Sequence, residues 1–235
     1  MSVSIFAIGD LHLSGSVDKP MDIFGQHWEN HWDKIRENWK KQVRSDEDIV
    51  LIPGDVSWAM KLQDAQVDLD SIGSLPGRKI MIKGNHDYWW SSISRLRSIV
   101  HPSIHVIQND SLTMSNYTFC GTRGWVNPGM KEFTQHDDKI FNRELHRLRL
   151  SLEKGREESE TAGTELIVLL HYPPFDDKGR PTEIVDIISR YKPVHVVYGH
   201  LHDESTRYAF EGIYKDTHYH LVSCDYLNFR LKQII

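Results

Sequence analysis

Cysteine and long apolar runs are scarce in this 235-residue sequence, and an excess of positive charge is missing, with 28 Lys and Arg residues against 33 Asp and Glu residues. The two cysteines, Cys120 and Cys224, are too few for a disulfide framework, and the apolar neighbours of Cys120 predict a small buried side chain. The first apolar run covers residues 3–8 and is too short for a secretory signal or a membrane span. We therefore expect a cytoplasmic protein in a reducing compartment, with no membrane partner.

The net charge is -5, whereas surfaces that bind nucleic acid are usually basic. A nucleic-acid partner is therefore not expected, although a local basic groove is left open. The chain has no internal repeat, and its length suits one α/β domain over residues 1–235 with enough core to fold alone. The sequence gives no indication of the oligomeric state.

Apolar residues at steps of three and four predict helices between short apolar strands. One predicted helix covers residues 26–43, and others contain residues 62–72, 93–100 and 141–152, the last continuing in a charged, solvated segment that ends near Gly163. Residues 104–107, 111–114 and 117–120 are predicted strands separated by turn residues, and residues 207–211 and 217–223 are candidates for a closing hairpin. The alternation predicts an α/β fold with a mixed sheet.

Acids, amides and histidines follow five of the apolar runs, at the point where each run stops. They are Asp10 and His12 after residues 3–8, Asp55 after 49–52, Asn85 and His86 after 80–82, His171 after 167–170, and His200 and His202 after 194–198. Ligands of open α/β sheets bind outside the carboxyl ends of parallel strands, so residues far apart in sequence can meet there. Because these side chains are of metal-ligand type, the pattern predicts a binuclear metal site.

Each of these residues has a simpler explanation when it is taken alone. A single Asp10 or Asp55 would be a helix cap or turn residue, and a single His171 or His200 a hydrogen-bonded core histidine. Eight such polar residues meeting at strand ends would be costly to bury unless cations compensated them. The set as a whole therefore favours the metal site.

The ordered motifs of the chain resemble those of the calcineurin-like metallophosphoesterase superfamily. They are Gly9-Asp10-Leu11-His12, Gly54-Asp55, Gly84-Asn85-His86-Asp87, His171 and Gly199-His200-Leu201-His202. The resemblance implies a four-layer α/β/β/α sandwich with mixed β-sheets and two metal ions at the strand ends. It assigns one ion to Asp10, His12, Asp55 and His202, and the other to Asp55, Asn85, His171 and His200, with Asp55 as the bridge.

The nitrogen and oxygen donors, without thiolate, suit Mn²⁺, Fe or Zn²⁺ better than Mg²⁺, and the sequence does not choose among the three. Two cations lower the pKa of a shared water, so a bridging hydroxide can attack phosphorus in line with the leaving group. His86 is the expected catalytic proton donor to the departing alkoxide, as the corresponding histidine is thought to be in the superfamily. Asp87 is a second catalytic candidate, to orient His86, but adjacent side chains of an extended chain point apart, so its role is left open.

The expected reaction is hydrolysis of a small phosphate ester, either a monoester or a diester, with nucleotides among the candidate substrates. Protein serine/threonine phosphatases of the superfamily carry an acid and an arginine shortly after the bridging aspartate. Asp55 is followed here by Val56-Ser57-Trp58-Ala59-Met60, so a protein phosphatase is less favoured. The alternative is a catalytically silent scaffold or binding protein on the same fold. It is less favoured, because every ligand position is filled.

Aromatic residues are frequent near the motifs, namely Trp58, Tyr88, Trp89, Trp125 and Tyr172. Some of them are candidates to stack on a nucleobase or another flat substrate group, and the alternative is that they pack against helix ends. Arg123 is a candidate to bind a phosphate with its planar donors, with a solvated surface position as the alternative. His218 and His220 alternate without acidic neighbours, which is typical of a solvated strand face.

Overall fold

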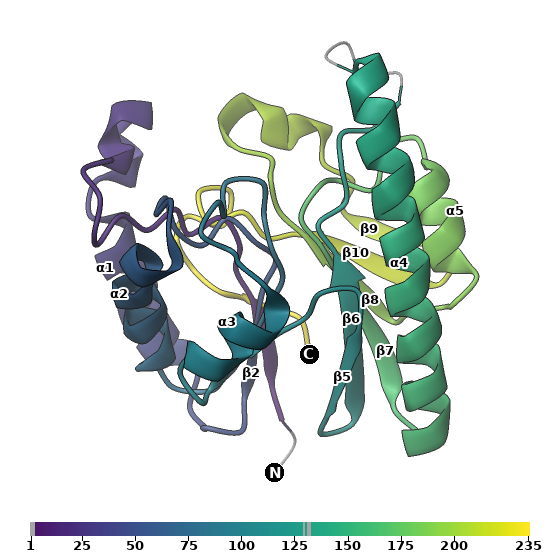
Figure 1. The fold of residues 1–235 in the computed structure, drawn as a ribbon, viewed down its shortest axis with the longest axis horizontal. Helices are drawn as coiled ribbons and strands as arrows, with labels where there is room; N and C mark the ends of the chain where they lie inside the picture. Colours follow the sequence, from purple (N-terminus) through teal and green to yellow (C-terminus); the bar gives the residue numbers. More distant parts are fainter. Residues whose placement is uncertain (1–2, 129, 131–132) are drawn as a thin grey trace. The chain divides into compact units, whose positions relative to one another are not determined.

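The computed structural model describes residues 3–128, 130 and 133–235. The chain forms two compact units, each containing one β-sheet (Figure 1). Unit 1 contains residues 3–106 and 222–235, and unit 2 contains residues 107–221. Unit 2 is therefore continuous in sequence, whereas unit 1 is completed by the last segment of the chain.

Unit 1 is built on a five-stranded sheet in the order β11-β1-β2-β3-β4. The strands are β1 (Ile5–Ala7), β2 (Ile49–Ile52), β3 (Arg78–Met81), β4 (Ile104–Val106) and β11 (Lys232–Gln233). Strands β1 to β4 are parallel to their neighbours, and β11 is antiparallel to β1. Every residue of β2 is buried.

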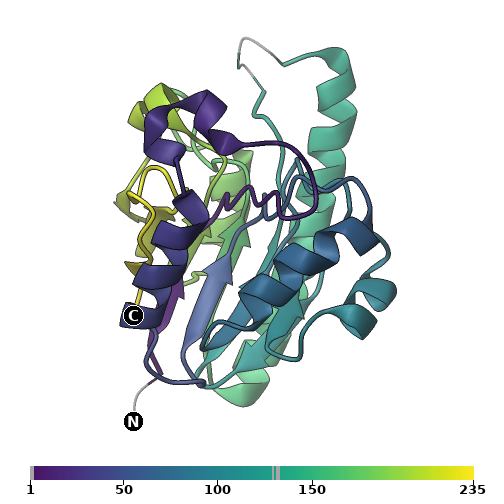
Figure 2. The same ribbon diagram turned by 90° about the vertical axis from the view of Figure 1, so that its left-hand side faces the viewer.

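Three helices pack on one face of this sheet, and Figure 2 shows them lying over its strands. They are α1 (His31–Gln42), α2 (Leu62–Gly73) and α3 (Ile93–Ile99), preceded by the short 3-10 helices η1 (Met21–Phe24) and η2 (Gln26–Trp28). Trp39 of α1 is fully buried among apolar residues of the sheet and α2, and its indole N–H donates to the carbonyl of Pro76 at 2.9 Å. Burial of an apolar side chain of this size contributes roughly 1.5–3 kcal/mol.

Unit 2 contains a six-stranded sheet in the order β5-β6-β7-β8-β10-β9. The strands are β5 (Ser111–Met114), β6 (Tyr117–Thr122), β7 (Glu165–Leu170), β8 (His195–Tyr198), β9 (Gly212–Tyr214) and β10 (Thr217–Leu221). The four central strands are parallel, and the edge strands β5 and β9 are antiparallel to their neighbours. The carboxyl ends of β7 and β8 therefore lie at the same edge of the sheet.

Two helices cover one face of the unit 2 sheet, as Figure 1 shows. They are α4 (Gln135–Ala162) and α5 (Glu183–Ser189), and a 3-10 helix, η3 (Asp203–Tyr208), follows β8. Thr134 and Asp137 form a capping box at the start of α4, and Gly163 ends the helix in the left-handed conformation, with φ 67°. Leu148 and Leu152 of α4 pack on Val168 of β7 in the apolar core of this unit.

The structure confirms the α/β class with mixed sheets and corrects two predicted elements. The helix predicted over residues 26–43 begins only at His31, because Asn30 adopts a left-handed conformation (φ 52°) after η2. The hairpin predicted from residues 207–211 and 217–223 is made by β9 and β10 instead. His220 is buried, so the predicted solvated position is wrong for this residue. The four-layer arrangement and the single domain stay predictions.

Both cysteines are buried and free, as the sequence predicts for Cys120. Among the described residues, no helix is both long and apolar enough to span a membrane.

Candidate metal centre

Three loops of unit 1 carry predicted site residues, and the first two bring Asp10, His12 and Asp55 close together. The loops follow β1, β2 and β3, and the first two pair through backbone hydrogen bonds from the N–H of Asp10 to Gly54 O and from the N–H of His12 to Asp55 O, both at 3.0 Å. The imidazole Nε2 of His12 lies 3.9 Å from Oδ2 of Asp55. The exposed fraction is 0% for Asp10 and 2% for Asp55, so two carboxylates are buried beside one imidazole.

The third loop brings Asn85 and His86 to the same carboxylate. The backbone N–H of His86 donates to Oδ1 of Asp55 at 2.8 Å. Gly84 makes this approach possible, because a Cβ at this position would lie 2.1 Å from Oδ1 of Asp55, which no real side chain allows. Both oxygens of Asp55 thus face residues of the predicted site.

Asp87 is fully buried and organises the backbone of these loops. Its carboxylate accepts hydrogen bonds from five N–H donors: the backbone N–H groups of Asp55, Val56, Ser57 and Gly84, and the indole of Trp89. The bonds from Asp55 and Gly84 go to Oδ2, and the other three go to Oδ1. These contacts give Asp87 a positioning role toward Asp55, and a catalytic role for it stays a prediction.

Asp68 of α2 supports the same loop from the helix side. Its carboxylate accepts hydrogen bonds from the hydroxyl of Ser57 and from the backbone N–H of Gly15. Burial raises the pKa of Asp68 above its usual value, and both hydrogen bonds oppose that shift. Nothing in the sequence pattern singles out Asp68, since it is one of three aspartates of α2 and an acid in an amphipathic helix is normally solvated.

Trp58 packs on the imidazoles of unit 1 and does not stand apart as a rim residue. Its ring stacks on His12 with centroids 4.7 Å apart, and it lies 4.6 Å from the ring of His86. The ammonium of Lys19 lies 3.1 Å from the Trp58 ring centroid, a cation–π contact that the sequence did not indicate. Trp58 therefore restricts the orientation of the two histidines.

The other two unit 1 aromatics differ in exposure. Trp89 is buried in the core, so the packing alternative holds for it, whereas Tyr88 is 58% exposed.

Unit 2 carries a second group of predicted ligands at the ends of β7 and β8. Nε2 of His171 lies 3.3 Å from Nδ1 of His200, and the ring of Tyr172 lies 4.1 Å from that of His200. His171 is fully buried. His202 is the N-cap residue of η3, and its backbone N–H donates to the hydroxyl of Ser205 at 2.9 Å.

Arg123 and Trp125 follow β6 in the same unit. Arg123 lies over the ring of Trp125 at 4.5 Å and forms an ion pair with Glu144 at 3.5 Å. With 18% side-chain exposure, Arg123 is not the solvated surface residue of the alternative interpretation. Trp125 donates its indole N–H to Asp137 at 2.9 Å, so it is held against the start of α4.

A pocket of about 390 Å³ opens next to His200 in unit 2. Its wall contains the aromatic residues Tyr172, Phe175 and Tyr208 and the carboxylates Asp176 and Asp177. Ligand sites are typically concave and largely apolar, with a few polar groups that fix orientation. Of this wall, the sequence indicates Tyr172 and His200 as site residues, and it does not indicate Phe175, Asp176, Asp177 or Tyr208, which lie outside the ordered motifs.

Several predicted ligands adopt a backbone conformation that side chains rarely accept. Asp10, His12, Asp55 and His200 have φ values of 56°, 47°, 51° and 73°. Such strained residues persist where the surroundings fix them and cluster at functional sites. Buried carboxylates with imidazoles and an amide nearby are a donor set that fits a divalent cation of the Mn, Fe or Zn class.

The sequence model of the calcineurin-like phosphoesterase family matches residues 3–204. This chain belongs to that family. Among curated protein sequences, none matches the phosphoesterase chain significantly.

Solved structures with the same fold are distant in sequence from this phosphoesterase. The phosphopantetheinyl hydrolase PptH from Mycobacterium tuberculosis has a TM-score of 0.57 and 14% identity, with 99% of this chain and 95% of that chain covered. The calcineurin-like phosphoesterase YfkN from Bacillus subtilis has a TM-score of 0.54 and 15% identity, with 94% and 81% covered. A putative 5'-nucleotidase from Staphylococcus aureus has a TM-score of 0.53 and 12% identity, with 93% and 48% covered.

Proposed function

We propose that this phosphoesterase hydrolyses small phosphate esters with the help of two divalent metal ions. The observation that supports the proposal most directly is the burial of Asp10 and Asp55 beside His12 in unit 1. Two carboxylates taken out of water at such close quarters are stable only when a cation or a proton compensates them. The family to which the chain belongs supports the cation.

The proposed ligands are those of the ordered motifs. By resemblance to the family motifs, one ion would be held by Asp10, His12, Asp55 and His202, and the other by Asp55, Asn85, His171 and His200. Asp55 is suited to contact both ions. One of its oxygens faces His12, and the other accepts the backbone N–H of His86, in the segment that carries Asn85. When bound, the ions supply Lewis acidity, which makes water nucleophilic near neutral pH and stabilises charge on the phosphoryl oxygens.

His86 is the proposed proton donor to the leaving alkoxide. It is next to the ligand Asn85 but is not assigned to a metal, and its ring packs beside Trp58. Imidazole is the side chain that most often serves as a general acid, because it can both hold and release a proton. The backbone hydrogen bond from His86 to Asp55 fixes the distance between this donor and the ligand loop.

The pocket beside His200 is the proposed site for the part of the substrate that does not react. Its aromatic wall offers Tyr208, which is 42% exposed, as a surface on which a flat group such as a nucleobase can stack. The carboxylates Asp176 and Asp177 favour substrate groups that donate hydrogen bonds. Replacing Tyr208 by Ala should raise KM for nucleotides while leaving hydrolysis of para-nitrophenyl phosphate unchanged, and equal changes for both would rule out this pocket.

The central test is the Asp55→Asn variant, with Asp18→Asn as the matched control. Asp18 is an exposed aspartate of the same unit, so its substitution changes the charge equally without touching the site. We expect Asp55→Asn to lose both ions and nearly all hydrolysis of para-nitrophenyl phosphate and its bis ester. Asp18→Asn should keep both properties.

Two other outcomes would contradict parts of the proposal. Metal content and turnover unchanged in Asp55→Asn would refute the ligand assignment. Absence of turnover in the unsubstituted protein with manganese, iron and zinc would instead favour the scaffold function on the same fold.

A further inference from the structure

Three histidines outside the ordered motifs meet on the unit 2 sheet. His195 belongs to β8, and His218 and His220 belong to β10. The strands are parallel, with His218 paired to His195 in the register, and His220 lies two residues further along β10. Alternate residues of a strand share a face, so all three side chains leave the sheet on the same side. Val196, Tyr198, Tyr219 and Leu221 pack with α4 and α5 in the core, and the histidines therefore occupy the opposite face.

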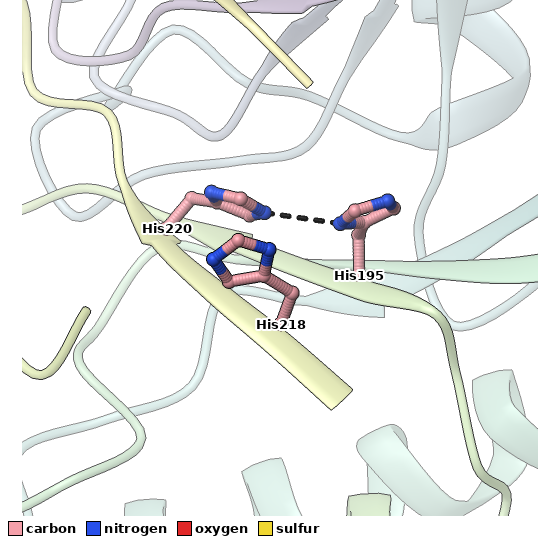
Figure 3. A group of neighbouring side chains, drawn as sticks. All are labelled: His195, His218 and His220. Atoms are coloured by element: carbon pink, nitrogen blue, oxygen red, sulfur yellow. Dashed lines mark hydrogen bonds between the residues drawn. The ribbon is translucent and has the colours of Figure 1, made fainter. Parts of the chain in front are cut away.

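The three rings converge on a common point. Nδ1 of His195 lies 3.0 Å from Nε2 of His220, and the rings of His218 and His220 have centroids 4.2 Å apart. One nitrogen from each ring lies within 4.8 Å of the others. Figure 3 shows a nitrogen of His218 turned toward the contact between the other two rings. Tetrahedral Zn–N bonds of about 2.0–2.1 Å place ligand nitrogens roughly 3.3 Å apart, so small side-chain rotations would suffice.

We propose that His195, His218 and His220 bind a single transition-metal cation of the Zn²⁺ class, at a site separate from the binuclear centre. Three imidazoles are the donors that Zn²⁺, Co²⁺, Ni²⁺ and Cu²⁺ prefer, whereas Mg²⁺ and Ca²⁺ require oxygen ligands. Three protein ligands leave a fourth tetrahedral position to water or another small ligand. His220 is buried while His195 and His218 are partly exposed, so a cation can reach the nitrogens from one side.

The local electrostatics agree with a cation ligated by neutral imidazoles. Burial lowers the pKa of His195, and the neighbouring His218 lowers it further. A neutral ring is the form that binds metal, so little free energy is needed to remove protons before binding. The hydrogen bond between His195 and His220 involves only two of the three rings. It does not explain why the ring of His218 also packs against His220, whereas a shared cation would use all three.

An ion at this position would join β8 to β10 through side chains as well as through the backbone ladder. β8 leads directly into Gly199 and His200, so the ion would fix the strand that delivers a proposed ligand of the catalytic metals. Any ligand that binds only the folded state stabilises it in proportion to its occupancy. The proposed site is therefore structural, and loss of one of its ligands should lower the melting temperature of the metal-loaded protein.

The test is a Co²⁺ titration of the whole chain, followed by visible absorption and by the amount of metal retained after gel filtration. His218→Gln and His195→Gln each remove one imidazole, and His146→Gln is the matched control, because His146 is an exposed histidine of α4. His220 is left unchanged, since substitution of a buried residue risks the fold. Circular dichroism establishes that each variant is folded.

We expect His218→Gln and His195→Gln each to bind one equivalent of Co²⁺ less than the unsubstituted protein and His146→Gln. The same difference of one equivalent should appear in the Asp55→Asn background, which separates this site from the proposed catalytic centre. Added Zn²⁺ should raise the melting temperature of the Asp55→Asn protein but not that of the Asp55→Asn/His218→Gln protein. Unchanged stoichiometry in folded His218→Gln and His195→Gln, or an equal loss in His146→Gln, would overturn the proposal.

Discussion

The strongest prediction concerns Asp87, the carboxylate that gathers the ligand loops of unit 1. Substitution by Asn preserves the shape of the side chain but replaces one acceptor oxygen by an NH₂ group that can only donate. Oδ2 accepts two of the five N–H hydrogen bonds and Oδ1 accepts three. Whichever way the amide turns, at least two N–H donors will face another donor in a buried site.

The expected magnitude follows from those two lost interactions. A hydrogen bond to a charged group contributes about 1.5–3 kcal/mol, and an unsatisfied buried donor carries a similar penalty. Asp87→Asn should therefore lower the free energy of unfolding by about 3–6 kcal/mol. Urea denaturation of the chelator-treated protein measures this change without a contribution from bound metal.

The control for this experiment is again Asp18→Asn, an exposed substitution expected to change stability by less than about 0.5 kcal/mol. The Asp87→Asn protein should also bind metal more weakly, because the backbone N–H of Asp55 is one of the donors that lose their acceptor. A stability loss no larger than that of Asp18→Asn would refute the idea that Asp87 organises the loops.

Three further predictions rest on single residues. His86→Ala should keep the metal content but slow the hydrolysis of alkyl phosphates far more than that of activated aryl phosphates, because a good leaving group needs no proton; equal losses in kcat for the two classes would exclude the acid role. Burial lowers the pKa of Lys79 from 10.5 to about 8, so the unfolded state binds more protons between these values and stability should rise with pH by up to about 3 kcal/mol. Carbonyl acceptors around the ammonium act against this shift, and the rise should be absent from urea denaturation of Lys79→Met over the same pH range. Gly121→Ala should prevent or strongly weaken folding, as judged by circular dichroism, because the added Cβ would lie 1.9 Å from the carbonyl oxygen of Leu169; normal stability would show that the strands can separate freely.

The elements that the sequence predicts well are those whose side chains alternate or repeat clearly. Leu62, Ala65, Leu69 and Ile72 mark α2, and the structure has this helix over Leu62–Gly73. Residues 111–114 form β5 as expected, since turn residues bound them on both sides. The start of α1 was predicted too early, because Trp28 continues the apolar spacing although Asn30 breaks the backbone.

Other elements cannot be recognised from their own residues, because they are stabilised by pairing or packing with neighbouring elements. β11 has only two residues, Lys232 and Gln233, and exists as a strand because β1 offers an edge. β9 has only three residues, and the side chain of Ile213 at its centre is exposed, so no buried apolar position marks the strand in the sequence. α5 is a seven-residue helix in which four of the residues are buried, and it has only two turns in which a helical period could show in the sequence.

The candidate site shows the same division. Asp10, His12, Asp55 and His86 could be predicted because strand ends deliver them in a fixed order. The roles of Asp87 and Asp68 could not, because each depends on which backbone N–H groups surround it. The convergence of His195 with His218 was also invisible, since it requires the register between β8 and β10.

The closing segment of the chain has a consequence for the order in which the protein can be assembled during synthesis. The backbone N–H of Gly9 donates to Val222 O, and the thiol of Cys224 donates to the carbonyl of Asp10. These bonds hold the loop of Asp10 and His12, and their partners follow the continuous segment 107–221 in the sequence. That segment can complete its own sheet before Val222 and Cys224 have been synthesised. The loop with the first two predicted ligands therefore gains these two hydrogen bonds only after the whole of segment 107–221 has been made.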